Sequence, residues 1–90
     1  MKKILAAAIK FYQEDTDSWI TMTGIRHADI LHNMYLLHIK HNKQKSIQGF
    51  ITNYNEFVDR YEAKEIAVEA NQLIVPIEQT YNELFSEDVW

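Results

Sequence analysis

The sequence predicts an α+β fold: a small antiparallel β-sheet with two main helices and a short C-terminal helix. Two observations predict it. Apolar residues alternate with period two near the start and in the middle of the chain, and they recur with helical spacing after each of these stretches. The 90 residues, 47% of them hydrophobic, make one domain, 1–90, with a thin core. Because a thin core gains from further burial, we expect a homo-oligomer, a dimer or larger.

Residues 3–23 predict a β-hairpin. In residues 3–12 the apolar positions of one face alternate as in a strand: Leu5, Ala7, Ile9 and Phe11. The alanines of this stretch also suit a helix, because alanine is the best helix former. Residues 14–17 are turn-forming and residues 19–23 are aromatic and β-branched, which favours the strand interpretation.

An amphipathic helix is predicted over 28–39, after Gly24 ends the second strand. It is apolar nearly all round at 34–37, which indicates a second buried face in a subunit interface. A polar loop over 40–46 leads to a strand, 47–52, and Gly49 marks a point in it where a backbone or a ligand approaches closely. A turn over 53–56 and a short strand at 57–58 follow.

The second main helix begins at a capping box. Asp59 is the expected N-cap, and Glu62 is expected to reach back to it. The apolar stripe of this helix consists of Ala63, Ile66, Ala67, Ala70 and Ile74. Pro76 restarts the chain as a first-turn proline. The short third helix is predicted from the spacing of Ile77, Tyr81, Leu84 and Phe85.

The composition argues against several classes of site. Without cysteine there is no disulfide, thiolate nucleophile or cysteine-based zinc site, which suits a reducing cytosol. The four histidines form neither an i, i+4 pair nor an HExxH motif, so no metal is expected. Because no GxSxG motif and no glycine-rich phosphate loop occur, we expect a binding protein without a cofactor rather than an enzyme.

Targeting signals are also missing from the sequence. The first apolar run stops at Lys10 without a cleavage motif, so it does not predict a signal peptide. No stretch approaches the ~20 apolar residues that cross a bilayer. We expect a protein of the cytoplasm that is not inserted in a membrane.

Charge is distributed unevenly along the chain, whose net charge is −4. Residues 26–45 carry four cations against one acid, and residues 56–90 carry nine acids against two cations. A chain of this charge is a poor binder of duplex nucleic acid, because phosphate contacts supply most of that affinity. The asymmetry suggests head-to-tail contact between subunits or a local anion site, and two solvated faces of opposite sign are the plainer alternative.

Both predicted main helices begin with cations: Arg26 and His27 on the first, and Arg60 on the second. A helix N-terminus already carries about half a positive charge, so a cation there is unfavourable unless an anion compensates. A phosphate at this position gains backbone N–H groups and bidentate arginine hydrogen bonds. The alternative is that the two arginines pair with nearby acids of the chain: Asp29, Asp59, Glu62 or the acidic tail.

Five segments occur together in the order 23–30 (TGIRHADI), 48–52 (QGFIT), 57–63 (FVDRYEA), 70–72 (ANQ) and 84–90 (LFSEDVW). The set resembles a family of small bacteriophage proteins with the pattern TGxRHxDxI, GFxTxxGRFVDRxEA, AGQ and LYSEDLW. This pattern is similar to the first-described class of phage anti-Thoeris proteins. The resemblance implies a sponge that binds a cyclic ADP-ribose isomer, or cyclic di- and trinucleotides, without cleaving it, in homo-oligomers with sites between subunits.

The same resemblance implies a set of ligand-binding residues: Arg26, His27, Phe50, Asp59 and Arg60. Glu56 is a further candidate from outside the pattern, because its carboxylate can accept a hydrogen bond from a base or a ribose. In this set Phe50 would stack on a base and Arg60 would hold a phosphate. The chain departs from the pattern at Asn55-Glu56, where relatives carry Gly-Arg, so a phosphate contact is lost and a carboxylate takes its place. Asn71 replaces a glycine of the pattern, a change that left-handed backbone tolerates.

Alternation along the strand 47–52 predicts that Phe50 is exposed, because it shares a face with Gln48 and Thr52. Ile51 is then the expected core residue. An exposed phenylalanine beside a glycine would offer a stacking surface for a purine. Two other functions stay open: an inhibitor that binds a host defence protein through the acidic segment 56–90, and a hydrolase that destroys the signal.

Overall fold

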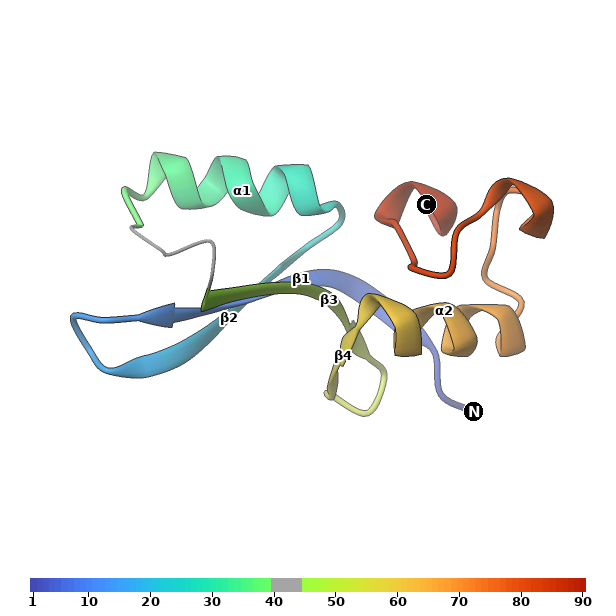
Figure 1. Ribbon diagram of the computed structural model, residues 1–90, viewed down its shortest axis with the longest axis horizontal. Helices are drawn as coiled ribbons and strands as arrows, with labels where there is room; N and C mark the ends of the chain where they lie inside the picture. Colours follow the sequence, from blue (N-terminus) through green and yellow to red (C-terminus); the bar gives the residue numbers. More distant parts are fainter. Residues whose placement is uncertain (40–44) are drawn as a thin grey trace.

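The computed structural model describes residues 1–39 and 45–90, and it confirms the α+β fold class. Four strands form an antiparallel sheet in the order β2-β1-β3-β4 (Figure 1). The strands are β1 (Ile4–Gln13), β2 (Ser18–Gly24), β3 (Ser46–Thr52) and β4 (Phe57–Asp59), and the helices are α1 (His27–Leu36) and α2 (Arg60–Glu69). The predicted hairpin and both later strands are confirmed. Of the predicted loop over 40–46, residues 40–44 lie outside the described residues and Ser46 belongs to β3.

One face of the sheet carries the core. β1 turns three buried side chains toward it: Ala7, Ile9 and Phe11. Leu5 was expected on the same face, but its side chain is exposed. The pairing of β1 with β3 shifts register between Ile4 and Ala6, so the strand bulges there and Ile4 is buried instead of Leu5.

The two helices lie over opposite ends of the sheet (Figure 1). α1 packs on β1 and β2, and α2 packs on β3 and β4 and reaches β1. Together they contribute five side chains to one core cluster: Ile30, Met34, Ala63, Ile66 and Ala67. The Asp59 carboxylate accepts a hydrogen bond from the backbone N–H of Glu62 at 2.8 Å, which confirms the predicted N-cap. Neither helix, nor any other in the described part of the chain, is long and apolar enough to cross a membrane.

Both helices end earlier than the apolar spacing predicts. α1 stops at Leu36 rather than at Ile39, because His38 adopts a φ of 55° and the N–H of Ile39 bonds back to the Met34 carbonyl at 2.9 Å. α2 ends in the same way, with Asn71 at a φ of 56°. The left-handed backbone expected at Asn71 is confirmed, and the predicted apolar stripe ends before Ile74, which is exposed.

Residues 70–90 return over the core and join distant parts of the chain. The side-chain amide of Gln72 bonds both the N–H and the carbonyl of Ile4 at 2.8 Å, and the N–H of Leu84 donates to the Arg60 carbonyl at 2.9 Å. These contacts override helical spacing over 77–85. The single helix predicted over 77–85 is therefore wrong: residues 77–79 form one 3₁₀ helix, η2 (Ile77–Gln79), residues 80–85 are not helical, and a second 3₁₀ helix, η3 (Ser86–Asp88), follows them.

Gly49 lies at the closest approach between β3 and β4. A Cβ atom at this position would lie 2.2 Å from the carbonyl oxygen of Val58 and 2.7 Å from the ring atom Cζ of Phe57. The Gly49 carbonyl also faces Nε2 of His27 at 2.8 Å. The close approach that the sequence predicts at this glycine is therefore made by the backbone and a side chain of the protein itself.

Candidate ligand-binding site

Arg60, the first residue of α2, is held from two sides. Its Nη2 donates to Oε1 of Gln48 at 2.6 Å, and its Cζ lies 4.8 Å from the ring centroid of Phe85. The guanidinium is half-buried, and its Nε is a buried donor without a hydrogen-bond partner among the described residues. An unpaired buried N–H costs about 1–3 kcal/mol. The arginine is thus held in place, and an acceptor from outside the protein reaches its Nε only if the side chain shifts.

A shallow pocket of about 420 Å³ opens beside this guanidinium. It is lined by Ser46, Ile47, Gln48, Asp59, Arg60, Tyr61 and Glu83. The Tyr61 hydroxyl donates to Glu83 at 3.0 Å, and this hydrogen bond raises the pKa of Tyr61. One cation flanked by two carboxylates and a hydroxyl suits a ligand that combines an anionic group with hydroxyl or amino donors.

Arg26 and His27 lie at the start of α1, as predicted, but they use their side chains within the protein. Arg26 Nη2 donates to the backbone carbonyl of Trp90 at 2.8 Å, and the Trp90 indole N–H donates to the Ile25 carbonyl. His27 is buried. Its ring meets the edge of the Phe50 ring at a centroid distance of 5.0 Å. Within the described residues neither Arg26 nor Arg60 forms an ion pair with an acid. The alternative that the two arginines pair with acids of the chain is therefore not observed there.

The expectation that Phe50 is exposed is wrong: its side chain is 0% exposed. The polar neighbours that suggested an exposed face are themselves directed inward. Thr52 is fully buried and its hydroxyl accepts from the N–H groups of Tyr54 and Glu56, while Gln48 is used by Arg60. Ile51, the expected core residue, is only half-buried on the other face. Phe50 therefore cannot stack on a base without a rearrangement of the core.

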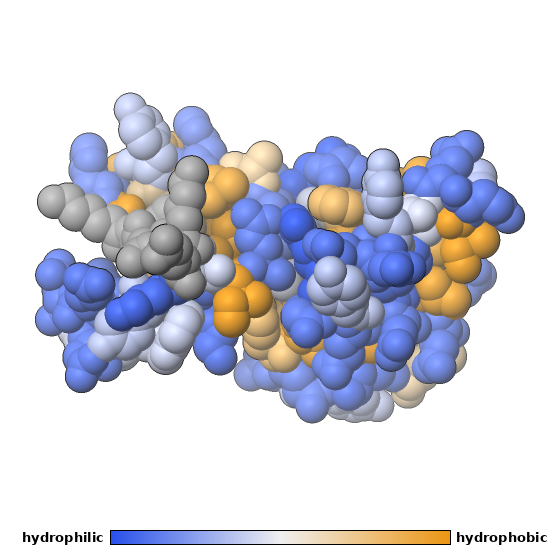
Figure 2. All heavy atoms as spheres, in the orientation of Figure 1, coloured by the Kyte–Doolittle hydropathy of each residue, from blue (hydrophilic) through white to orange (hydrophobic). Residues whose placement is uncertain are grey.

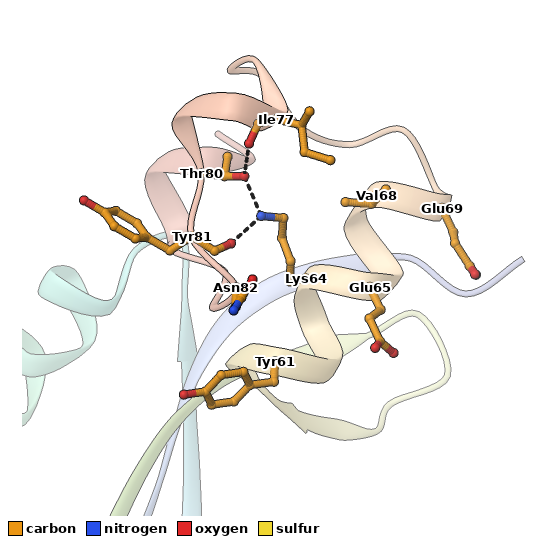
Figure 3. Close-up of a pocket in the computed structure, with 9 residues that line it drawn as sticks. All are labelled: Tyr61, Lys64, Glu65, Val68, Glu69, Ile77, Thr80, Tyr81 and Asn82. Atoms are coloured by element: carbon orange, nitrogen blue, oxygen red, sulfur yellow. Dashed lines mark hydrogen bonds between the residues drawn. The ribbon is translucent and has the colours of Figure 1, made fainter.

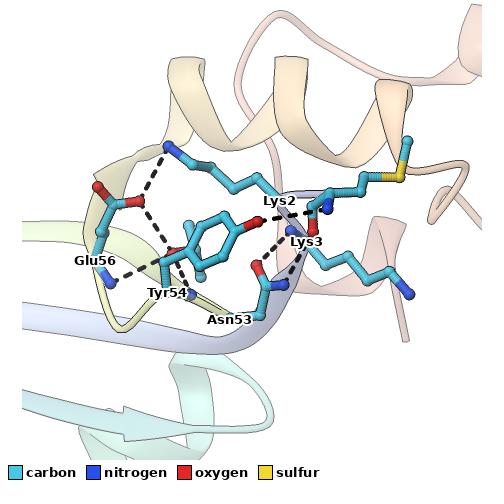
Figure 4. Close-up of polar contacts among 7 residues, drawn as sticks. Lys2, Lys3, Asn53, Tyr54 and Glu56 are labelled. Carbon is cyan, nitrogen blue, oxygen red and sulfur yellow. Dashed lines mark hydrogen bonds and ion pairs between the residues drawn. The ribbon is translucent and has the colours of Figure 1, made fainter.

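Glu56 lies apart from the Arg60 pocket. Its carboxylate pairs with the Lys2 ammonium at 3.0 Å, and this partner raises the pKa of Lys2 (Figure 4). The same turn ties the N-terminus to the sheet, because Asn53 bonds the N–H of Lys3 at 2.8 Å and the carbonyl of Met1 at 3.0 Å. Of the six candidate residues, the structure places Asp59 and Arg60 together in one pocket and leaves Glu56 outside it.

Around Arg60 lie residues that the sequence did not reveal as its partners. Gln48 and Phe85 lie in segments of the chain that resemble the phage family pattern. Nothing in their spacing, however, indicates that Gln48 accepts a hydrogen bond from the Arg60 guanidinium or that the Phe85 ring packs on it. Glu83 and Tyr61 come together only because residues 70–90 fold back along α2. A long-range pairing of this kind has no signal in local periodicity.

One serine–histidine pair occurs in the interior, where Ser86 Oγ lies 3.5 Å from Nδ1 of His27. The two residues are 2% and 6% exposed, so a substrate cannot reach them. Their arrangement is that of a packing contact between η3 and α1. Within 1–39 and 45–90, no cluster of three or more potential metal ligands is found.

Acid should destabilise the protein through His27. Burial lowers the pKa of His27 below its ordinary value of 6.5, and the positive charge of Arg60 lowers it further, against the opposing effect of the Gly49 hydrogen bond. The folded protein binds a proton at His27 less readily than the unfolded chain does. The stability that neutral His27 contributes is therefore fully present above about pH 6.5 and is lost as the pH falls toward the pKa of His27 in the folded protein. Thermal melts between pH 7.5 and 5 should show a loss of stability in the wild type that is smaller in His27→Gln. Equal losses in both proteins would contradict it.

The sequence model of the family described as Phage T4 y16D protein matches residues 3–90. No curated protein and no solved structure matches the chain. The family match includes every residue that lines the Arg60 pocket and both helix starts.

Proposed function

We propose that this chain, which belongs to the family described as Phage T4 y16D protein, is a phage anti-defence sponge that binds a cyclic nucleotide signal and sequesters it uncleaved. The signal would be a cyclic ADP-ribose isomer or a cyclic di- or trinucleotide. The protein acts in the cytoplasm of the infected bacterium as a homo-oligomer. It needs no cofactor and no turnover, because a stoichiometric sink with slow release suffices.

The observation that supports this proposal most directly is the half-buried guanidinium of Arg60, which lines an open pocket. A phosphate oxygen is the acceptor that guanidinium geometry suits best, since two parallel N–H donors meet two oxygens. The position at the start of α2 adds the backbone N–H groups of a helix N-terminus. The carboxylates of Asp59 and Glu83 then face the hydroxyl or amino groups of the same ligand.

The ligand-release assay tests the function itself. The protein is incubated separately with a cyclic ADP-ribose isomer and with cyclic di- and trinucleotides, freed of unbound ligand, denatured, and the released small molecule is identified by mass. Intact nucleotide supports a sponge, and a cleaved product would show an enzyme. Retention of none of these ligands would reject the sponge and favour the alternative, an inhibitor that binds a host defence protein directly.

Replacing Arg60 by alanine should weaken nucleotide binding about 10- to 150-fold, because a hydrogen bond to a charged group contributes about 1.5–3 kcal/mol. The fold should survive, because the removed guanidinium carries an unpaired buried donor and the backbone bond from Leu84 is retained. Calorimetric titration with the retained nucleotide measures the change. Arg60→Lys is the matched control, since it keeps the charge and loses the fork, and it should recover only part of the affinity. Unchanged affinity in Arg60→Ala would remove this residue from the site.

A further inference from the structure

A second pocket, which we call the tyrosine pocket, lies next to the Arg60 pocket. It has a volume of about 320 Å³, and its lining consists of Tyr61, Tyr81, Asn82, Glu83 and Phe85. Tyr61 and Tyr81 are 58% and 74% exposed. Figure 3 shows both rings projecting toward the same side of the molecule, with Asn82 between them. A pocket of this size falls within the range of small-molecule sites.

The tyrosine pocket adjoins the Arg60 pocket, because Tyr61 and Glu83 line both of them. The hydrogen bond of 3.0 Å from the Tyr61 hydroxyl to Glu83 fixes this shared wall. Phe85 connects the two pockets as well. Its ring centroid lies 4.8 Å from Cζ of Arg60 and 6.0 Å from the centroid of Tyr81, which it meets edge to face. Only one ring therefore separates the guanidinium from the Tyr81 ring.

The surface becomes less polar with distance from Arg60. A groove of about 840 Å³ between α2 and residues 77–82 continues the tyrosine pocket, and Val68 and Ile77 are exposed on its walls. Hydrophobic residues are visible between α2 and the C-terminal segment at the right-hand end of Figure 2. Lys64 donates to the Thr80 hydroxyl and to the Tyr81 carbonyl, so the protein itself uses two of its three donors (Figure 3). An elongated ligand is thus best bound with its anionic group at the Arg60 pocket and its less polar end at the tyrosine pocket.

We infer that the tyrosine pocket receives a nucleobase of the ligand whose phosphate lies at Arg60. Stacking on an aromatic ring suits every base, because each base presents a flat π face. The side-chain amide of Asn82 forms no hydrogen bond within the described part of the chain, so its donor and its acceptor are both available to the edge of the base. Such an amide pairs well with the amino group and the adjacent ring nitrogen of adenine. The inference rests on the proposed function for the position of the phosphate.

The test compares adenosine 5′-monophosphate with ribose 5-phosphate, which has the same sugar and phosphate but no base. Titrations followed by amide NMR shifts measure both affinities. The wild-type chain should bind the mononucleotide about 5- to 150-fold more tightly, which is the range expected for one stacked base. Tyr81→Ala should abolish this difference and leave the affinity for ribose 5-phosphate unchanged, because Arg60 is intact. Tyr81→Phe keeps the ring and should bind both compounds like the wild type.

Tyr35→Ala is the matched control, because Tyr35 is 77% exposed on α1 and lies outside both pockets. It should bind adenosine 5′-monophosphate like the wild type. Tyr35 and Tyr81 are both solvent-exposed, so the melting curves of the two alanine variants should stay close to that of the wild type.

Asn82→Asp tests the edge of the base. A carboxylate only accepts hydrogen bonds, so this variant should prefer adenosine 5′-monophosphate, which has a 6-amino group, over inosine 5′-monophosphate, which has a 6-oxo group. The ratio of the two affinities should rise at least about fivefold over that of the wild type. An unchanged ratio would overturn the role of Asn82.

Three results would overturn the inference as a whole: no measurable binding of the mononucleotide, equal affinity of the wild type for the two phosphates, or a Tyr81→Ala variant that binds like the wild type. These results are distinguishable from a failure of the proposed function. A chain that retains a cyclic nucleotide in the ligand-release assay but fails here is a sponge that binds its base elsewhere. A chain that passes here but retains no cyclic nucleotide has the base pocket without the sponge function.

Discussion

Replacing Phe50 by alanine should lower the free energy of unfolding by about 3–5 kcal/mol, because the side chain is fully buried and its removal leaves a cavity. The ring lies in the core next to two other rings, with its centroid 5.0 Å from His27 and 6.4 Å from Trp90. The loss should appear without any ligand. Denaturant unfolding measures it, and Trp90 offers a fluorescence signal close to the altered position.

The matched control for this variant is Tyr54→Ala, which removes an aromatic ring from an exposed turn of the same β3–β4 hairpin. Its loss should stay within about 0.5–1 kcal/mol. A Phe50 variant that keeps its stability and loses nucleotide affinity would show that the ring recognises ligand rather than packs. Any effect of this variant on affinity is otherwise expected to follow from the disturbed core.

Replacing Gly49 by alanine should cost about 3 kcal/mol, at the upper end of overpacking effects. The added Cβ would lie 2.2 Å from the Val58 carbonyl oxygen, which belongs to the backbone of a paired strand and cannot rotate away. The strands must therefore separate, and β4 and the start of α2 are displaced with them. Hydrogen exchange of the β3–β4 amides, together with denaturant unfolding, would locate and measure the change.

Gly24→Ala is the control for this prediction. A Cβ at Gly24 would meet Cγ1 of Ile30 at 2.9 Å, which is the side chain of a helix residue and can shift. The loss at Gly24 should therefore be clearly smaller than that at Gly49. Equal losses at the two glycines would mean that β4 yields more easily than its hydrogen-bonded pairing suggests.

Local chemistry was sufficient to predict most of the elements. The turn residues 14–17, the N-cap of Asp59 and the glycine in β3 each have one dominant physical role, and the structure uses them in that role. Where a residue's role depends on distant partners, the sequence was misleading. Leu5 is turned outward by a register shift against β3, and residues 77–85 follow contacts to Arg60 and Asp88 instead of their own helical spacing.

In the candidate site, too, roles set by local chemistry could be predicted and roles set by distant partners could not. The sequence was enough to predict that the cations at the two helix starts need a partner, because a cation at a helix N-terminus is unfavourable without one. Phe50 was misplaced because Gln48 and Thr52 look like solvent-facing residues, whereas the fold gives each of them an interior hydrogen bond. Phe85 and Glu83 join Arg60 only through the return of the chain along α2, a contact between residues more than twenty positions apart.

The amide of Gln72 on Ile4 also has a consequence for how the protein folds. It joins residues 68 positions apart, and the His27–Ser86 contact joins residues 59 apart, so the native topology depends on pairings between distant parts of the chain. Chains of this kind fold slowly, in about milliseconds to seconds, since loop-closure entropy is lost before the contacts form. Synthesis at about 5–20 residues per second adds to the delay. Leu84 and Val89 belong to the same core cluster as Ile9 and Phe11, so this core is completed only after the last residues of the chain have been synthesised.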